Sequence, residues 1–99
     1  MIQLTEKQEK MINKLSKYLK TYDIPNGYKI VHNHVVYHSG ILGDSYPNHY
    51  TVVIQRKDSK WFGIFNLDID VFNHQTWDRI KEMTNVYIKS VINDIRSKL

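Results

Sequence analysis

The chain has 99 residues, which is enough for one domain and too few for two. Its hydrophobic content of 41% and charged content of 24% are ordinary for a globular protein, and no apolar run approaches the roughly 20 residues that span a bilayer. Zero cysteines exclude disulfides, thiolate catalysis and thiolate zinc sites. We therefore expect a single domain over residues 1–99, without insertion into a membrane.

The net charge is +4 and the pI is about 9.3, which favours acidic partners. The first ten residues lack the apolar core of a secretory signal, so we expect a cytoplasmic protein. The chain has no alanine and is rich in isoleucine, lysine, asparagine and tyrosine, a bias typical of AT-rich genomes. The expected compartment is therefore the cytoplasm of a low-GC bacterial host cell.

The first helix is predicted to begin at about Thr5. Thr5 and Gln8 have the spacing of a capping box, in which each side chain binds the backbone of the other residue. Pro25 and Gly27 predict the turn that ends it. Between them, apolar side chains recur every three or four residues and form one stripe: Met11, Ile12, Leu15, Tyr18, Leu19 and Tyr22.

Residues 28–38 are rich in β-branched and aromatic side chains, which favours a strand. The stretch is nearly palindromic and could instead fold on itself at His32 and Asn33. We favour one continuous strand, because Asn33 lacks the following glycine of a two-residue hairpin turn. Residues 39–49, with two glycines and a proline, are predicted to be the longest loop.

Residues 50–56 and 61–67 are predicted to be two strands of a hairpin. If Lys57 pairs with Lys60, alternation puts six residues on one face of the sheet: Tyr50, Val52, Ile54, Gly63, Phe65 and Leu67. The other face carries Val53, Phe62 and Ile64. Both faces are apolar, so we expect cover on both sides, from helices or from another molecule.

The last element is a long helix capped by Asn73 or Thr76. Its apolar stripe continues for about five turns, through Ile80, Thr84, Tyr87, Ile88, Val91, Ile92, Ile95 and Leu99. The order of helix, three antiparallel strands and long helix predicts an α+β fold.

Three histidines are the candidate metal ligands. His32, His34 and His38 would project from one face of a continuous strand, where a His-x-His pair can hold a metal ion. The strand contains no carboxylate to orient the rings, so we interpret them first as solvated or partner-facing and only second as ligands.

Asp68, Asp70 and His74 form the other candidate cluster. Paired carboxylates can bind magnesium or act as acid and base, but before a helix they more often serve as caps. The serines have no nucleophile motif and the glycines no phosphate-binding pattern. We therefore expect no enzymatic activity and no cofactor, with a small His/Asp metal-dependent hydrolase as a remote alternative.

Basic residues provide a second kind of candidate surface. The first helix carries a stripe of lysines opposite its apolar face, namely Lys7, Lys10, Lys14 and Lys17. Cations and aromatic rings also alternate around the hairpin, where the cations are Arg56, Lys57 and Lys60. These seven residues are the contacts expected in a nucleic-acid-binding protein. For the lysine stripe, a solvated helix face is the preferred interpretation.

Two resemblances bear on this choice. The element order is that of the double-stranded-RNA-binding domain, and residues 47–50 resemble the loop before that family's second strand. That family has a lysine cluster at the start of its last helix. In this chain the corresponding residues 71–77 contain no such cluster, so only the architecture carries over. In size and composition the chain is similar to small accessory proteins of phages and plasmids, a group that includes anti-CRISPR inhibitors.

The sequence therefore predicts a non-catalytic binding module, a phage-type or mobile-element accessory protein that binds and inhibits a host or defence protein. A nuclease or nucleoprotein complex is the kind of partner expected, and an anti-CRISPR-like inhibitor is the leading hypothesis. A homodimer that covers the spare sheet face is a variant of it. The predicted contact residues are Tyr46, Val53, Trp61, Phe62 and Ile64.

Overall fold

The computed structural model describes residues 3–58 and 61–98, and the side chains of Trp61 and Phe62 are outside that description. Its elements are α1 (Glu6–Leu19), β1 (Tyr28–Ser39), β2 (Ser45–Arg56), β3 (Trp61–Asp68), α2 (Val71–His74) and α3 (Trp77–Ser97). The strands form one antiparallel sheet in the order β1-β2-β3. The predicted α+β fold is confirmed, and the short helix α2 is added to it.

Both long helices begin where their side chains can satisfy the free backbone amides of the first turn. The capping box of α1 is present, because Thr5 Oγ1 accepts from the Gln8 amide at 3.1 Å and Gln8 Oε1 accepts from the Thr5 amide at 2.8 Å. Of the two caps considered for the last helix, Thr76 is the N-cap of α3. Asn73 belongs to α2, which the sequence pattern did not separate from the helix that follows.

β1 is one continuous strand, as favoured from the sequence, and the predicted loop of residues 39–49 is wrong. Residues 45–49 belong to β2, because their backbone pairs with the second half of β1. Pro47 is accommodated at a register shift, which is where a sheet tolerates a missing amide. Only residues 40–44 form the turn, closed by the Gly40 amide donating to Asp44 O at 2.6 Å.

The predicted register of the second hairpin is confirmed where the strands run regularly, with Ile54 opposite Gly63 and Val53 opposite Ile64. Next to the turn the register differs, since Gln55 pairs with Trp61 after an irregularity in the ladder. From the pair of Ile54 and Gly63 to the end of the ladder away from the turn, side chains alternate between the two faces as expected.

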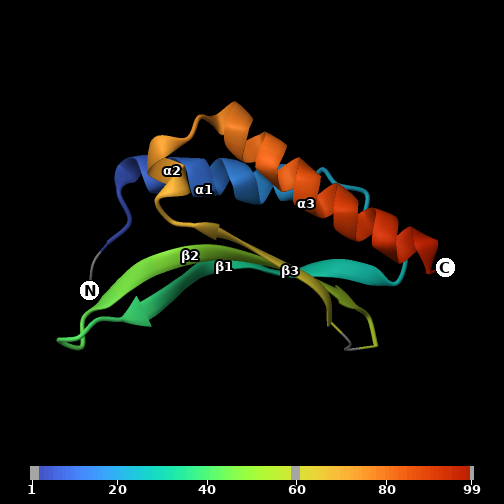
Figure 1. Ribbon diagram of the computed structural model, residues 1–99, viewed down its shortest axis with the longest axis horizontal. Helices are drawn as coiled ribbons and strands as arrows, with labels where there is room; N and C mark the ends of the chain where they lie inside the picture. The colour runs from blue at the N-terminus through green and yellow to red at the C-terminus, as the bar shows by residue number, and fades with distance from the viewer. Residues whose placement is uncertain (1–2, 59–60, 99) are drawn as a thin grey trace.

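The molecule has two layers, with the sheet in one and all helices in the other (Figure 1). The core between the layers consists of buried side chains from both: Met11, Ile12, Leu15, Leu19, Tyr50, Val52, Ile54, Phe65, Leu67, Ile69, Phe72, Ile80, Ile88, Ile92 and Ile95. The expected cover on both sides of the sheet is therefore not supplied by this chain, since the helices lie over one face. Both ends of the sheet bend away from the helices, toward the uncovered side (Figure 1).

Across residues 3–58 and 61–98, the structure contains no helix that is both long and apolar enough for a membrane span.

Candidate binding face of the sheet

The uncovered face of the sheet carries side chains from all three strands. Most of them alternate along their strand with side chains that pack in the core, and pairing places the rest on the same face, His32 opposite Val53 and His38 opposite Tyr46. We call them the open face: His32, His34, Val36 and His38 of β1, then Tyr46, His49, Thr51 and Val53 of β2, and Ile64, Asn66 and Asp68 of β3.

Aliphatic side chains lie near the middle of the open face. Val53 is half-buried between its cross-strand neighbours His32 and Ile64, while Ile64 keeps 53% of its surface exposed. Three of the five predicted contact residues, Tyr46, Val53 and Ile64, therefore lie on the same face. The other two, Trp61 and Phe62, have side chains outside the described residues.

The same face is rich in histidine. The rings of His32 and His34 have their centroids 5.3 Å apart, and His38 has its centroid 5.6 Å from that of His49 and 6.2 Å from that of Tyr46. The shared face predicted for His32, His34 and His38 is thus found. His49 was missed because it was assigned to a loop, although extending the alternation back by one residue from Tyr50 would have placed it on this face. Its Nδ1 is 2.7 Å from Asn48 Oδ1, which fixes the orientation of the ring.

The carboxylate cluster considered from the sequence serves the turn into α2. Asp68 Oδ1 accepts from the Asp70 amide at 3.0 Å, and His74 lies at the far end of α2. Within the described parts of the chain, no three His, Asp or Glu side chains are close enough together to hold one metal ion.

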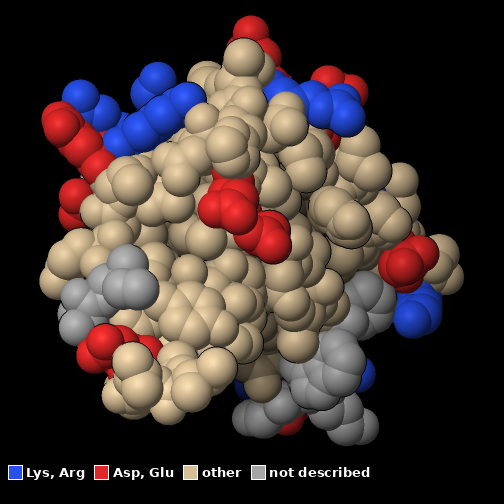
Figure 2. Space-filling view, turned by 60° about the vertical axis from the view of Figure 1, so that its left-hand side comes forward, with Lys and Arg blue, Asp and Glu red and all other residues tan. Residues whose placement is uncertain are grey.

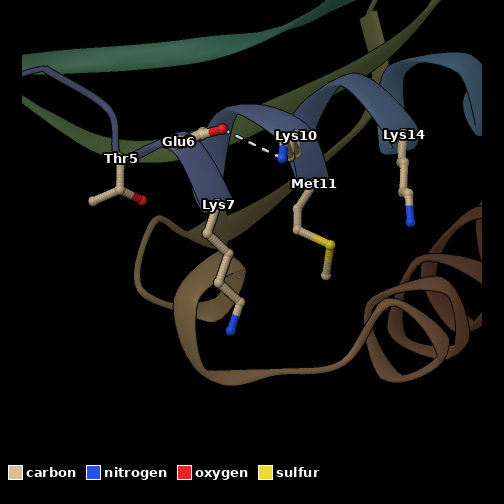
Figure 3. A pocket seen from close by; sticks show the side chains of 6 residues that line it. All are labelled: Thr5, Glu6, Lys7, Lys10, Met11 and Lys14. Atoms are coloured by element: carbon tan, nitrogen blue, oxygen red, sulfur yellow. Dashed lines mark ion pairs between the residues drawn. The ribbon is translucent and has the colours of Figure 1, made fainter.

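The lysine stripe of α1 borders an open groove of about 630 Å³, which faces α2 and the start of α3 (Figure 3). Lys7 Nζ donates to Asn73 O at 2.6 Å, near the C-terminal end of α2, where a cation is favoured. Lys10 pairs with Glu6 at 3.3 Å, and Lys14 Nζ lies 6.0 Å from the centre of the Trp77 ring. Three lysines of the stripe therefore already have partners within the chain.

The hairpin cations do not extend this stripe into one surface. Arg56 is paired with Asp58, and the Lys57 amide donates to Gly27 O at 2.8 Å, while Lys60 is outside the described residues. In Figure 2 most Lys and Arg side chains on this side of the molecule lie along its upper edge, with acidic side chains both among them and near the middle. Among the described candidates, the lysines lie on α1 in the helical layer and Arg56 and Lys57 lie at one end of the sheet, so they do not form one continuous basic surface.

An exposed apolar tip was missed entirely by the sequence reasoning. Ile41 and Leu42 occupy the turn between β1 and β2, where their exposed fractions are 104% and 91%. Gly43, at φ +85°, allows the turn to close. Two adjacent aliphatic residues between glycines were the available signal. We call Ile41 and Leu42 the hairpin tip.

The titratable side chains of Tyr50, which is buried, and Tyr22, which is half-buried, lie on the covered side of the sheet. Burial raises the pKa of Tyr50 to about 12, because the phenolate is poorly solvated in the core, and the Ser16 hydroxyl opposes this rise in part. Burial also raises the pKa of Tyr22, and a hydrogen bond with Tyr18 acts in the same direction. These shifts therefore concern stability and lie away from the open face.

No protein-family model, curated protein or solved structure matches the chain.

Proposed function

We propose that this chain is a non-catalytic binding module whose open face docks on an apolar, weakly charged surface of a protein partner. The observation that carries the proposal is the exposure of Ile64, at 53%, on a sheet face that none of the chain's helices covers. Three of the eleven open-face residues, Val36, Val53 and Ile64, are aliphatic, and they share the face with four histidines and Tyr46.

The charge of the open face supports a protein surface over nucleic acid as the partner. With histidines counted as neutral, the eleven open-face residues named above carry one formal charge, the negative charge of Asp68, and the exposed Lys29 follows this set at the end of β1 away from His38. A phosphate backbone requires lysine and arginine contacts. The stripe lysines Lys7, Lys10 and Lys14 lie on the helical layer and have partners there, so the nucleic-acid hypothesis gains no support from their arrangement.

In its specific form, the proposal is an accessory protein of the phage type that inhibits a host or defence protein by covering one of its surfaces. Such a protein needs no active site. The hairpin tip and Tyr46 lie at one end of the sheet and extend the contact beyond the strands.

The test is capture of the partner from the source cell or its phage host with matched variants. Ile64→Asp places a charge in the contact, which should cost about 3 kcal/mol or more, a loss of over a hundredfold in affinity. Val86→Asp is the control, because Val86 is also an exposed aliphatic residue, at 65%, but lies on α3. Equal capture by the Ile64 and Val86 variants would refute the docking face.

Charge reversal at Lys10, Lys14 and Lys17 distinguishes the nucleic-acid alternative from docking on a protein partner. Under the proposal, the native chain elutes from heparin at low salt, and the triple glutamate variant captures the protein partner as well as the native chain does. Tight, salt-sensitive binding to RNA that the triple variant loses would favour the alternative.

A further inference from the structure

The strand β1 forms one edge of the sheet. Among the residues that the structure describes, β2 is the only strand that pairs with β1, so the outer side of β1 faces no strand. With histidines counted as neutral, its 12 residues carry one formal charge, that of Lys29, and they include no proline. A long edge strand with so little charge is open to pairing with a strand of another molecule.

Three exposed apolar side chains lie toward one end of this edge. Tyr37 alternates with Val36 and His38 of the open face, so its ring, which is 40% exposed, points to the helical side. The hairpin tip, Ile41 and Leu42, follows at the end of the strand (Figure 1). The monomer leaves all three side chains in water.

An open apolar groove lies at the opposite end of the same edge. It has a volume of about 330 Å³ and lies between β1 and the connection from α1, where Tyr22, Ile24 and Ile30 supply apolar lining. Figure 1 shows this connection toward the end of the molecule where α3 finishes, and the turn of residues 40–44 at the other end. The length of β1 therefore separates the groove from the exposed apolar side chains.

The two ends of the edge are also complementary in charge. Lys20 and Lys29 line the groove, whereas Asp44 is the one charged residue of the turn of residues 40–44. All three are exposed, and none of them takes part in an ion pair within the described residues. Asp23, in the connection from α1, does not line the groove. This complementarity points to a second copy of the chain as the occupant of the groove.

We propose that two copies of this chain pair along β1 in antiparallel orientation, so that Tyr37 and the hairpin tip of each copy cover the groove of the other. A twofold axis perpendicular to the sheet produces both contacts at once. The register of β1 on β2 is regular between its two shifts, over residues 32–36, and His34 is the midpoint of this stretch. The axis passes beside His34.

Counting residues from His34 shows which side chains meet. Tyr37 is three residues after His34 and is therefore level with residue 31 of the second copy, next to Ile30 in its groove. Ile41 is seven residues after His34 and is level with Gly27, beside the connection that closes the groove. The apolar side chains thus reach the groove along its length.

The same count brings opposite charges together. The Gly40 amide donates to Asp44 O, so Asp44 is level with Gly40. Gly40 is six residues after His34 and is level with Tyr28 of the second copy. Asp44 of each copy therefore lies near Lys29 of the other.

The curvature of the sheet and the path of α1 leave room for this pair. Because the axis is perpendicular to the sheet, both open faces lie on the same side and both sheets bend the same way (Figure 1). α1 begins near the end of β3, where Gln8 Nε2 donates to Ile69 O, and it ends at the groove, which Leu19 lines. It approaches the β1 edge only at the groove, where the second copy presents its hairpin tip and not its own α1.

Sedimentation velocity of the purified chain tests the pair. Because the contact is small, we expect monomers at about 1 µM and dimers at about 1 mM. A chain that stays monomeric at about 1 mM would overturn the proposal. Species larger than a dimer would overturn it as well, because they would show an open head-to-tail contact without the twofold axis.

Charges at the hairpin tip should prevent dimerisation. Ile41→Asp with Leu42→Asp should keep the chain monomeric at the higher concentration and leave its circular dichroism spectrum unchanged, because both side chains are exposed. Val86→Asp is the matched control, since Val86 is an exposed aliphatic residue on α3 and should dimerise as the native chain does. Equal association of the two variants would exclude the tip from the contact.

Charge exchange tests the contact between Asp44 and Lys29. Asp44→Lys and Lys29→Asp should each weaken the dimer about fivefold, because like charges then face each other. The two changes together should restore most of the native affinity. Losses that simply add in the double variant would rule out this contact.

A single cysteine tests the position of the axis, since the native chain contains none. His34→Cys places two thiols opposite each other, with Cβ atoms roughly 4.5–5.5 Å apart, so oxidation should join the two chains. His32→Cys is the control, because this exposed position shares the strand and the face but lies two residues from the axis. Equal cross-linking of both variants would indicate chance collisions and refute the arrangement.

The inference does not rest on the proposed function, because the pair leaves both open faces uncovered on one side. In the pair, the hairpin tips contact the second copy instead of the protein partner. If the native chain stays monomeric while Ile64→Asp loses the partner, the proposed function stands and this inference fails. If the dimer forms while the Ile64 and Val86 variants capture the partner equally, the reverse holds.

Discussion

Val91 of α3 lies directly over Gly63 of β3, so closely that a methyl group on Gly63 would come within 3.1 Å of Val91 Cγ2. This contact fixes the distance between the last helix and the edge strand. It also explains why a glycine is found inside a strand, where it otherwise weakens pairing.

Gly63→Ala is expected to destabilise the protein, because the added methyl group overpacks a contact that the β-branched Val91 cannot relax freely. We expect a loss of about 1–3 kcal/mol in the free energy of unfolding, measured by urea denaturation. Val91→Ala in the same chain should recover much of that loss. Additivity of the two changes to within about 0.5 kcal/mol would contradict the contact.

Tyr50→Phe is expected to leave the protein equally stable or to stabilise it by up to about 1 kcal/mol at pH 8. The reason is that Tyr50 Oη is buried without a hydrogen-bond partner of good geometry among the described residues. Removing the hydroxyl therefore removes a desolvation cost. Tyr37→Phe, at a ring that is 40% exposed, is the control and should change little.

The pH dependence of the same variant tests the burial of Tyr50 independently. The pKa of Tyr50 rises from 10.0 in the unfolded chain to about 12 in the folded protein, so the folded state holds the proton more tightly. This contribution to stability is complete below pH 10 and is lost as the pH rises to about 12. Urea denaturation between pH 9 and 12 should show a shallower loss for Tyr50→Phe than for the native chain.

Asn85→Ala should destabilise the packing of α1 on α3. Tyr18 Oη donates to Asn85 Oδ1 at 2.9 Å, and Tyr22 Oη donates to the same oxygen. Without the amide, two half-buried phenols lose their acceptor, at a cost of about 1–3 kcal/mol. In a chain that already carries Tyr18→Phe and Tyr22→Phe, the same change should cost much less, and an undiminished cost would refute the shared acceptor.

Ile41→Ser with Leu42→Ser is expected to leave the free energy of unfolding within about 0.5 kcal/mol of the native value, because both side chains of the hairpin tip are exposed. Retention on a hydrophobic-interaction column should fall. Gly43→Ala in the same turn should instead cost about 1 kcal/mol, since Gly43 has φ +85°. Stability loss in the double serine variant would mean that the tip packs against the sheet.

Local rules of the chain were sufficient to predict much of the fold. The capping pair of Thr5 and Gln8 marked the start of α1, and alternation separated Val53 and Ile64 from the core residues of β2 and β3. These predictions succeed because capping and side-chain period depend on residues within a few positions of one another. The extent of β2 failed for the opposite reason: residues 45–49 become strand only through pairing with β1, which Gly43 and Pro47 masked in the sequence.

The sequence by itself determined that each face of the sheet carries apolar side chains and that the helices are amphipathic. Both properties follow from the spacing of side chains along the chain. Only the tertiary structure decided that α1 and α3 share one face of the sheet, which leaves Ile64 and the histidines of the open face uncovered. Periodicity states that an apolar surface must be buried, but not by which element. That choice depends on the geometry of the connections and on long-range contacts such as Val91 on Gly63.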